Sequence, residues 1–407
     1  MNADGRPAAP SRHAGTVALV ATLAIQMFTA VVTSAPAVLA PVLAPDLGIT
    51  PKWIGVFVAF TFAGAMVGSL GCGEFIVRHG AIRVSQVAVG LCVAGIGSMA
   101  LLPAAGAPLL VVAGFVAGLG YGPITAASSE VLARTTPADR MALTFSIKQT
   151  GVPAGAALAG ALLPALALAT GWRVAFLAVA LAGVAVAIAA EPTRKSLDLR
   201  SSARQAFSLA TLLRPLRVVV GTPRLRELSL VGLAFAAVQT SLSTFLVVYL
   251  TDGLGWSLVA AGLALTCATS CAVAGRILWG MAADRWWAPN RILAAIGVLA
   301  SVCGAVLALA GPGWPAWFVL PLVGAYGATA IGWNGVQLSE LARRAPPGMA
   351  AAVTGASGFL TFAGVVFGPL LYAGLAALTG GYRAGFAASA VISGLAAAAL
   401  IRHGSRG

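Results

Sequence analysis

Two basic side chains stand inside long apolar runs of this chain, where a charge is expensive to keep. Arg276 lies in the run 258–283, eight residues before Asp284, and Lys148 lies in the run 142–168, eight residues after Arg140. At a helical rise of about 1.5 Å per residue, both lie about 12 Å from the nearer ends of their helices. The two predicted helices therefore hold cations at the same depth.

Neither cation has an evident acidic partner at that depth. The 11 acidic residues and the 3 histidines fall in loops or near predicted helix ends. A charge in the middle of a membrane costs about 2.5–3.5 kcal/mol on insertion scales, and side chains that stay charged there normally have partners. The pattern predicts an anion site in which the substrate supplies the missing charge. Arginine suits a carboxylate because its planar fork binds two oxygens. The alternative is that both side chains snorkel to the membrane interface.

The surrounding sequence predicts a membrane protein. Of its 407 residues 59% are hydrophobic and 9% are charged, whereas soluble domains carry about 25% charged residues. Apolar runs of this length are typical of membrane-spanning helices. The fold class is an all-α integral membrane protein with twelve transmembrane helices, expected at 16–42, 53–77, 84–103, 108–133, 142–168, 173–190, 228–251, 258–283, 292–311, 316–341, 349–379 and 384–401.

The distribution of basic residues predicts the orientation. With the N-terminus in the cytoplasm, the outer loops hold only Lys52, Arg173 and Arg383, and nearly all other basic residues lie on the inner side. This asymmetry predicts that both termini are cytoplasmic in a bacterial cytoplasmic membrane. The net charge of +14 does not indicate nucleic-acid binding, because the basic residues form short clusters between apolar runs. The 5 cysteines lie in apolar runs without metal-binding spacing, so we expect neither a metal site nor a disulfide.

The chain divides into two halves that repeat each other. We expect a six-helix bundle over 1–190, a basic cytoplasmic linker over 191–227 that could include an amphipathic surface helix, and a second six-helix bundle over 228–407. Glu130 and Arg134 fall on Glu340 and Arg344 at a constant offset, and "GWRVAF" at 171–176 falls on "GYRAGF" at 381–386. A substrate path between two such units is expected near the midplane.

A loop motif gives the chain its family resemblance. Gly280, Asp284 and Arg285 form a glycine, three residues, an aspartate and a basic residue, and a weaker copy has Gly73, Val77 and Arg78. In these features the chain resembles the major facilitator superfamily over essentially its whole length. The first copy lacks the family's aspartate, and Glu74, one turn before Arg78, is a partial replacement.

The resemblance implies a conformational latch at the cytoplasmic helix ends, in which glycines allow close helix approach and acidic residues pair with basic ones. The alternative is that these charges are solvated helix ends with local i,i+4 pairs. The candidate latch residues are Gly280, Asp284, Arg285, Gly73, Glu74, Arg78, Glu130, Arg134, Glu340 and Arg344.

The resemblance also sharpens the anion site. An arginine at the position of Arg276 looks like the substrate-binding arginine of monocarboxylate transporters, and oxalate/formate antiporters pair theirs with a lysine. Lys148 would serve here, although it lies in 142–168 rather than in the eleventh helix. Neutral polar residues in helices that line the family's cavity complete the candidate substrate-binding set, and interhelical hydrogen bonding is the alternative for each. They are Gln26, Tyr121, Gln239, Asn334, Gln149 and Gln337.

The function expected from these features is secondary active transport of a small organic anion, such as a monocarboxylate, by alternating access. No GxxxxGK[ST] loop occurs, so a gradient would drive it. The proton could accompany the anion, or the protein could exchange anions. The runner-up is efflux of hydrophobic drugs or metabolites, and a membrane sensor or enzyme is a third class. We expect no enzyme activity, no cofactor and no nucleic-acid partner. The expected partners are an anionic substrate and membrane lipid, with the chain acting as a monomer.

Overall fold

The computed structural model describes residues 12–49, 52–101, 107–198 and 209–404, and within these ranges it contains helices and no strand. Twelve of its helices are long and apolar enough to cross a membrane. The predicted all-α architecture with twelve membrane spans is therefore confirmed.

The described helices divide between the two halves of the chain. The first half contains α1 (Arg12–Val38), α2 (Ala40–Asp46), α3 (Lys52–His79), α4 (Ala81–Leu101), α5 (Ala107–Thr135), η1 (Ala138–Arg140), α6 (Met141–Gln149), α7 (Gly151–Thr170) and α8 (Trp172–Leu197). The second half contains α9 (Leu209–Gly221), α10 (Pro223–Val248), η2 (Tyr249–Gly253), α11 (Leu258–Arg285), α12 (Pro289–Leu309), α13 (Ala316–Ala330), α14 (Asn334–Arg344), α15 (Ala350–Thr379) and α16 (Arg383–Gly404).

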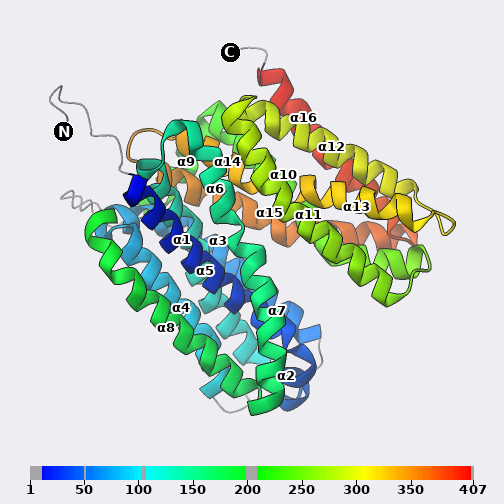
Figure 1. Cartoon of the computed structure of the whole chain (residues 1–407), viewed down its shortest axis with the longest axis horizontal. Helices are drawn as coiled ribbons and strands as arrows, with labels where there is room; N and C mark the ends of the chain where they lie inside the picture. The colour runs from blue at the N-terminus through cyan, green and yellow to red at the C-terminus, as the bar shows by residue number, and fades with distance from the viewer. Residues whose placement is uncertain (1–11, 50–51, 102–106, 199–208, 405–407) are drawn as a thin grey trace.

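The helices gather into two bundles that meet at one end of the molecule and diverge toward the other (Figure 1). Within the first bundle α5 packs on α3 and α4, and within the second α12 packs on α16 and α10 on α15. We call the end that carries the start of α1 and the end of α16 the terminal face. Contacts between the bundles run from α3 to α15 and from α6 to α11 and α14, near this face. The basic-residue asymmetry predicts that the terminal face is cytoplasmic.

Two spans expected to be continuous are interrupted, which corrects the predicted helices 142–168 and 316–341. The first breaks at Thr150, between α6 and α7, and the second at 331–333, between α13 and α14. Pro153 explains the first break, because its ring nitrogen cannot donate to the carbonyl of Gln149 one turn earlier. These breaks lie beside the two buried cations described below.

The bounds of the region between the bundles also differ from the expectation. The helix α8 continues to Leu197 rather than ending at 190, and α10 begins at Pro223, where proline is favoured in a first turn. Between them α9 packs on α3, α10 and α15, so it contacts both bundles. Residues 199–208 of the predicted linker lie outside the described residues.

Acidic residues fix two of the short connections. Asp198 accepts hydrogen bonds from the backbone N–H groups of Ile82 and Arg83 at 2.7 and 3.2 Å, at the start of α4. Gly80, at φ +90°, precedes this turn, and a Cβ there would lie 2.2 Å from the Asp198 side chain. Burial raises the pKa of Asp198, and the two backbone hydrogen bonds act in the opposite direction.

At the opposite end of the molecule, α2 is tied to the start of α8. Asp46 accepts a hydrogen bond from Trp172 Nε1 at 2.8 Å and pairs with Arg173. The hydrogen bond from Trp172 is the main cause that lowers the pKa of Asp46, and Arg173 adds to it.

Candidate functional site

Arg276 of α11 is buried and is held by three neutral oxygen atoms. Its Nε donates to the Ile331 carbonyl at 3.3 Å, one terminal nitrogen donates to the Gln149 carbonyl at 2.8 Å, and the other donates to Asn334 Oδ1 at 3.3 Å. The first two acceptors are backbone groups at the helix breaks. The Gln149 carbonyl has lost its helical donor because residue 153 is proline, and Ile331 lies in the break before α14. The guanidinium therefore satisfies carbonyls that the broken helices leave open.

Lys148 of α6 is also buried, but it bonds only within the first bundle. Its Nζ lies 2.6 Å from Gln26 Oε1 of α1 and 3.0 Å from Gln149 Oε1. Gln149 thus contacts both cations, one through its side chain and the other through its carbonyl.

Both cations are buried and neither is paired with a described carboxylate. Among the described residues no carboxylate lies within ion-pair distance of either. Arg276 is 3% exposed and Lys148 is 1% exposed. The alternative in which both side chains snorkel to the interface is therefore wrong. The prediction that both cations hold one anion remains untested.

A cavity of about 160 Å³ lies between the bundles, and Arg276 forms part of its wall. Six of the eight predicted substrate-binding residues line it, all but Lys148 and Gln26. The substrate-binding role of these six residues remains a prediction, and Lys148 contacts the side chain of Gln149 instead of the cavity. The lining residues are Phe62, Ser69, Tyr121, Gly122, Thr125, Ala126, Gln149, Val152, Ala236, Gln239, Thr240, Arg276, Trp333, Asn334, Gln337, Leu338, Thr354, Ser357, Gly358, Thr361, Phe362 and Val365.

Aromatic rings form another part of the wall and were missed in the sequence, apart from Tyr121. The ring of Phe62 lies 6.4 Å from that of Tyr121 and 6.0 Å from that of Phe362, between centroids, so the cluster joins α3, α5 and α15. Trp333 donates from Nε1 to Gln239 Oε1 at 3.1 Å. Phe62 and Phe362 lie in apolar runs where nothing distinguishes a lining ring from one that faces lipid.

Hydroxyl groups of α15 also line the cavity. Thr354, Ser357 and Thr361 recur at helical spacing on one face of this helix. The hydroxyls of Thr354 and Ser357 are buried and have no hydrogen-bond partner among the described residues. A buried polar group without a partner is costly, so this face favours a ligand that brings hydrogen-bonding groups.

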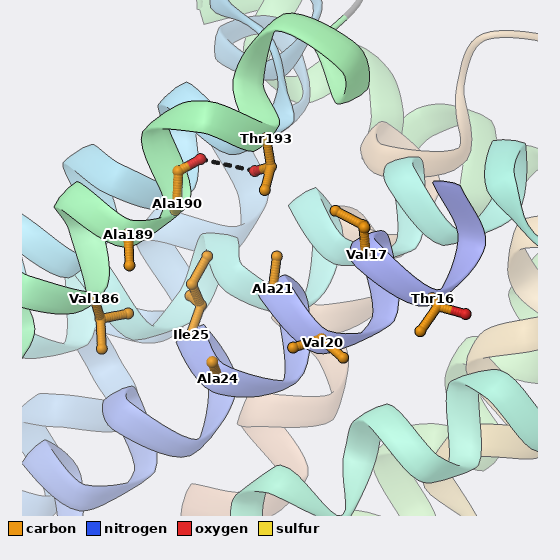
Figure 2. Close-up of a pocket in the computed structure, with 10 residues that line it drawn as sticks. All are labelled: Thr16, Val17, Val20, Ala21, Ala24, Ile25, Val186, Ala189, Ala190 and Thr193. Atoms are coloured by element: carbon orange, nitrogen blue, oxygen red, sulfur yellow. Dashed lines mark hydrogen bonds between the residues drawn. The ribbon is translucent and has the colours of Figure 1, made fainter. Parts of the chain in front are cut away.

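A second hollow differs from this cavity in its chemistry. It lies between α1 and α8, and its lining residues are apolar apart from two threonines (Figure 2). They are Thr16, Val17, Val20, Ala21, Ala24, Ile25, Val186, Ala189, Ala190 and Thr193. Thr193 Oγ1 donates to the Ala190 carbonyl at 2.7 Å, within its own helix. With no charged side chain in its wall, this groove has nothing to hold an anion.

Carboxylates at the terminal face bind helix N-termini of the opposite bundle. Asp284 of α11 accepts hydrogen bonds from the backbone N–H groups of Ala142 and Leu143 at 3.0 and 2.8 Å, at the start of α6. Glu130 of α5 accepts from the Ala351 N–H at 3.2 Å, at the start of α15. Helix N-termini favour such negative charges. The first copy of the loop motif has Val77 where the second copy has Asp284. In the first bundle Glu130 binds a helix N-terminus of the opposite bundle instead.

Glycines allow the close approach at this face. A Cβ on Gly280 would lie 2.6 Å from Ser146 Oγ, and one on Gly335 would lie 2.3 Å from Ser146 Cα. Gly73 packs in the same way against Ala352, where a Cβ would lie 2.8 Å from its Cα.

The other predicted latch residues lie near these contacts. Arg134 pairs with Glu130 at 3.5 Å, and Arg344 pairs with Glu340. Glu74 and Arg78 are half-buried on the last turns of α3, and Arg285 is exposed. Their roles as a latch remain a prediction.

Comparisons with known proteins agree with this architecture. The chain is 28% identical to the hexuronate transporter of Bacillus subtilis over 156 residues, which is 38% of this chain and 36% of that protein. It is 27% identical over 303 residues to a putative metabolite transport protein of Haemophilus influenzae, covering 70% of this chain and 72% of that protein.

Solved structures share the fold. The Escherichia coli fucose:proton symporter has a TM-score of 0.76 at 16% identity, covering 96% of this chain and 99% of that one. The human organic anion transporter MFSD10 has a TM-score of 0.72 at 17% identity, covering 97% and 100%. A bacterial homologue of the iron transporter ferroportin, in an outward-facing state, has a TM-score of 0.76 at 16% identity, covering 96% and 99%. Since the family model described as Major Facilitator Superfamily matches residues 22–369, the chain belongs to that superfamily.

Proposed function

We propose that this chain is a secondary transporter that moves a small organic anion by alternating access, and that Arg276 binds the carboxylate. Family membership makes the chain a multi-pass membrane transporter and not an enzyme. The observation that carries the proposal is the buried guanidinium of Arg276 in the cavity wall, with only neutral partners.

The hydrogen-bond count at Arg276 leaves room for a carboxylate. A guanidinium has five N–H donors, and three of them bond to Ile331, Gln149 and Asn334. One hydrogen on each terminal nitrogen remains. A carboxylate can accept two N–H groups at once, and bonds between charged groups are the strong ones. An anion here would also offset the cost of the buried positive charge.

The rest of the wall supports a hydroxylated acid. Amides and hydroxyls from α10, α14 and α15 surround the cavity, and rings of Phe62, Tyr121, Phe362 and Trp333 provide surfaces for an apolar face of the ligand. A sugar acid combines these properties, and the partial relative from Bacillus subtilis is named as a hexuronate transporter. No acidic side chain lines the cavity, so its wall does not favour the efflux of cationic drugs.

The arrangement of the bundles supports the transport cycle. They are in contact at the terminal face and diverge at the other end (Figure 1). Moving the substrate to the terminal face requires the bonds of Asp284 and Glu130 to break and the bundles to rock apart. Each chain forms a complete cavity, so the proposed working unit is a monomer in membrane lipid.

A thermal-shift screen of the purified protein tests the proposal. The panel is glucuronate, lactate, benzoate and nitrate, measured for wild type and Arg276→Gln. We expect selective stabilisation of the wild type by a carboxylate. Removing one partner of a buried charge pair costs about 2–5 kcal/mol, so the variant should bind at least about 30-fold more weakly.

The matched control is Arg383→Gln, which removes an arginine that bonds the Ala310 carbonyl outside the cavity. It should keep the wild-type response. Equal stabilisation of wild type and Arg276→Gln by the same carboxylate would contradict the proposal. A response to hydrophobic cations alone would favour the efflux alternative.

A further inference from the structure

A groove of about 370 Å³ between α4 and α8 combines a polar end with an apolar wall. Three polar side chains line it, from Arg83 and Gln86 near the start of α4 and from Glu191 near the end of α8. Every other lining residue is apolar, and these residues continue along the two helices to Val93 and Gly183. Because α8 ends beside the start of α1, the polar end of the groove lies at the terminal face.

The apolar part of the groove faces the lipid. The helices α4 and α8 pack on helices of the first bundle and lie on its side away from the second bundle (Figure 1). In the wall Ile188 is 67% exposed and Val184 is 44% exposed. A Cβ on Gly90 would meet no heavy atom within 4 Å, so this side of the groove is open. From Glu191 to Gly183 the wall extends about 12 Å at the helical rise, along which an acyl chain would contact apolar residues.

The acid at the polar end is already bonded within the protein. One oxygen of Glu191 accepts from Gln86 Nε2 at 2.8 Å, and the other pairs with Arg194 at 2.9 Å. The same Gln86 nitrogen also donates to the Ala187 carbonyl at 2.9 Å, so the amide is held between the two helices. An ammonium group entering the groove would therefore have to compete with these bonds for the carboxylate.

The basic groups at this end are open to a ligand. Arg83 is exposed, and its side chain makes one hydrogen bond among the described residues, to the neutral Gln86 Oε1 at 3.4 Å. A guanidinium has five N–H donors, so most of them remain available. Lys195 is also exposed and adds positive charge near Glu191. Neither base is paired with a described carboxylate, and Asp198 is bonded to the first N–H groups of α4.

We propose that this groove binds one anionic phospholipid, such as phosphatidylglycerol, with its phosphate on Arg83 and an acyl chain along Gly90 and Gly183. The planar guanidinium can donate to two phosphate oxygens at once. Basic groups at the cytoplasmic ends of membrane helices attract anionic headgroups, and the basic-residue asymmetry places the terminal face in the cytoplasm. The lipid site is separate from the cavity between the bundles, and it does not depend on the proposed transport of an anion.

The groove on the other side of α8 provides a contrast within the same molecule. Its wall, between α1 and α8, is apolar apart from two threonines and contains no charged side chain (Figure 2). Such a groove can take an acyl chain but cannot select the headgroup. Selection for an anionic lipid is therefore expected only where Arg83 stands at the end of the apolar wall.

The experiment titrates the purified full chain in detergent with dioleoyl phosphatidylglycerol or dioleoyl phosphatidylethanolamine and counts bound lipids by native mass spectrometry. The two lipids share the same acyl chains and the same phosphate, and only the second carries an ammonium group. We expect the first phosphatidylglycerol to bind about fivefold or more tightly than the first phosphatidylethanolamine. A phosphatidylglycerol with a diazirine in its acyl chain should crosslink to α4 and α8 between the residues that line the groove.

Two variants separate the headgroup contact from the apolar contact. Arg83→Gln removes the charged partner of the phosphate, so it should weaken phosphatidylglycerol about tenfold and abolish the preference between the lipids. Gly90→Leu fills the groove, so it should weaken both lipids and leave the preference in place.

Each variant has a matched control. Arg291→Gln removes an exposed arginine at the corresponding place near the start of α12, which does not line the groove. Gly160→Leu enlarges an exposed glycine of α7 whose added Cβ would also meet no heavy atom within 4 Å. Both controls should bind the two lipids as the wild type does.

Several results would overturn the inference. Equal binding of the two lipids by the wild type would refute selection of an anionic headgroup, and crosslinks on other helices would refute the location. A loss in Arg291→Gln as large as that in Arg83→Gln would show that any arginine at the interface has the same effect. Unchanged binding in a folded Gly90→Leu protein would show that the groove holds no acyl chain. The wild-type preference and crosslinks decide the question even if the variants do not fold.

Discussion

Removing the Asp284 carboxylate should open the terminal face. In the structure this side chain bonds two backbone N–H groups at the start of α6, at 3.0 and 2.8 Å, across the contact between the bundles. A hydrogen bond to a charged group contributes about 1.5–3 kcal/mol when buried. Because Asp284 is half-buried, we take the low end for the pair, about 2–3 kcal/mol. Asp284→Ala should therefore shift the equilibrium between closed and open terminal faces about 30- to 150-fold toward the open state.

A native thiol reports this shift. Cys72 of α3 is 2% exposed, and its Sγ lies 2.8 Å from the position of a Cβ on Gly355 of α15, so the contact between the bundles covers it. In a protein whose other cysteines are replaced by alanine, the rate of Cys72 modification by a small maleimide follows the open population. We expect modification about 30- to 150-fold faster in Asp284→Ala than in the parent.

The control for this prediction is Asp139→Ala, an exposed acid of η1 whose ion-pair partner is the adjacent Arg140. It should leave the modification rate at the parent value. An unchanged rate in a folded Asp284→Ala protein would refute the reasoning, because the carboxylate would then hold nothing closed.

Three further perturbations have defined outcomes. Gly335→Ala places a Cβ 2.3 Å from Ser146 Cα, so it should also speed Cys72 modification by forcing the bundles apart. Thr354→Val removes a buried hydroxyl that has no partner among the described residues, so it should raise the free energy of unfolding by about 1 kcal/mol and weaken glucuronate more than benzoate. Asp46→Asn should reduce the decrease of the melting temperature at acid pH. The pKa of Asp46 is lowered, chiefly by the hydrogen bond from Trp172, so its contribution is present above the unfolded pKa of ~3.9 and lost as the pH falls through the folded value.

The first two of these perturbations have a matched control. A Cβ added on Gly90 would have no heavy atom within 4 Å, so Gly90→Ala should leave Cys72 covered. Thr266→Val alters an exposed threonine that bonds its own helix, so it should not change the preference between the two acids. The packing at Gly335 would be contradicted if Gly335→Ala left the rate of Cys72 modification unchanged. The role of Thr354 would be contradicted if Thr354→Val left the preference between glucuronate and benzoate unchanged. The role of Asp46 would be contradicted if the melting temperature of Asp46→Asn fell at acid pH as in the parent.

The twelve spans could be predicted because length and hydropathy determine them. The rotation of each side chain about its helix could not. Lys148 turns toward Gln26 of α1, whereas Arg276 turns toward α14, and only tertiary packing decides between such directions. The break at Thr150 follows from Pro153 once the partner of the Gln149 carbonyl is known. The break at 331–333 contains no proline and has no comparable local signal.

The polar wall of α15 shows a second limit. The stretch "GASGFLTFAGVVFGPLL" at 355–371 predicts a packing surface of small residues, and Gly355 indeed lies against Ser69. The same helix also lines the cavity with Thr354 and Ser357. Serine and threonine are compatible with both roles in a membrane helix, so their type and spacing do not distinguish packing from binding.

The most direct test of the central claim is an electron cryomicroscopy structure of the protein with the panel carboxylate that stabilises it most. The account predicts carboxylate density within hydrogen-bond distance of both terminal nitrogens of Arg276, in the cavity between the bundles. Density for the anion elsewhere, with Arg276 still bonded only to Ile331, Gln149 and Asn334, would contradict it.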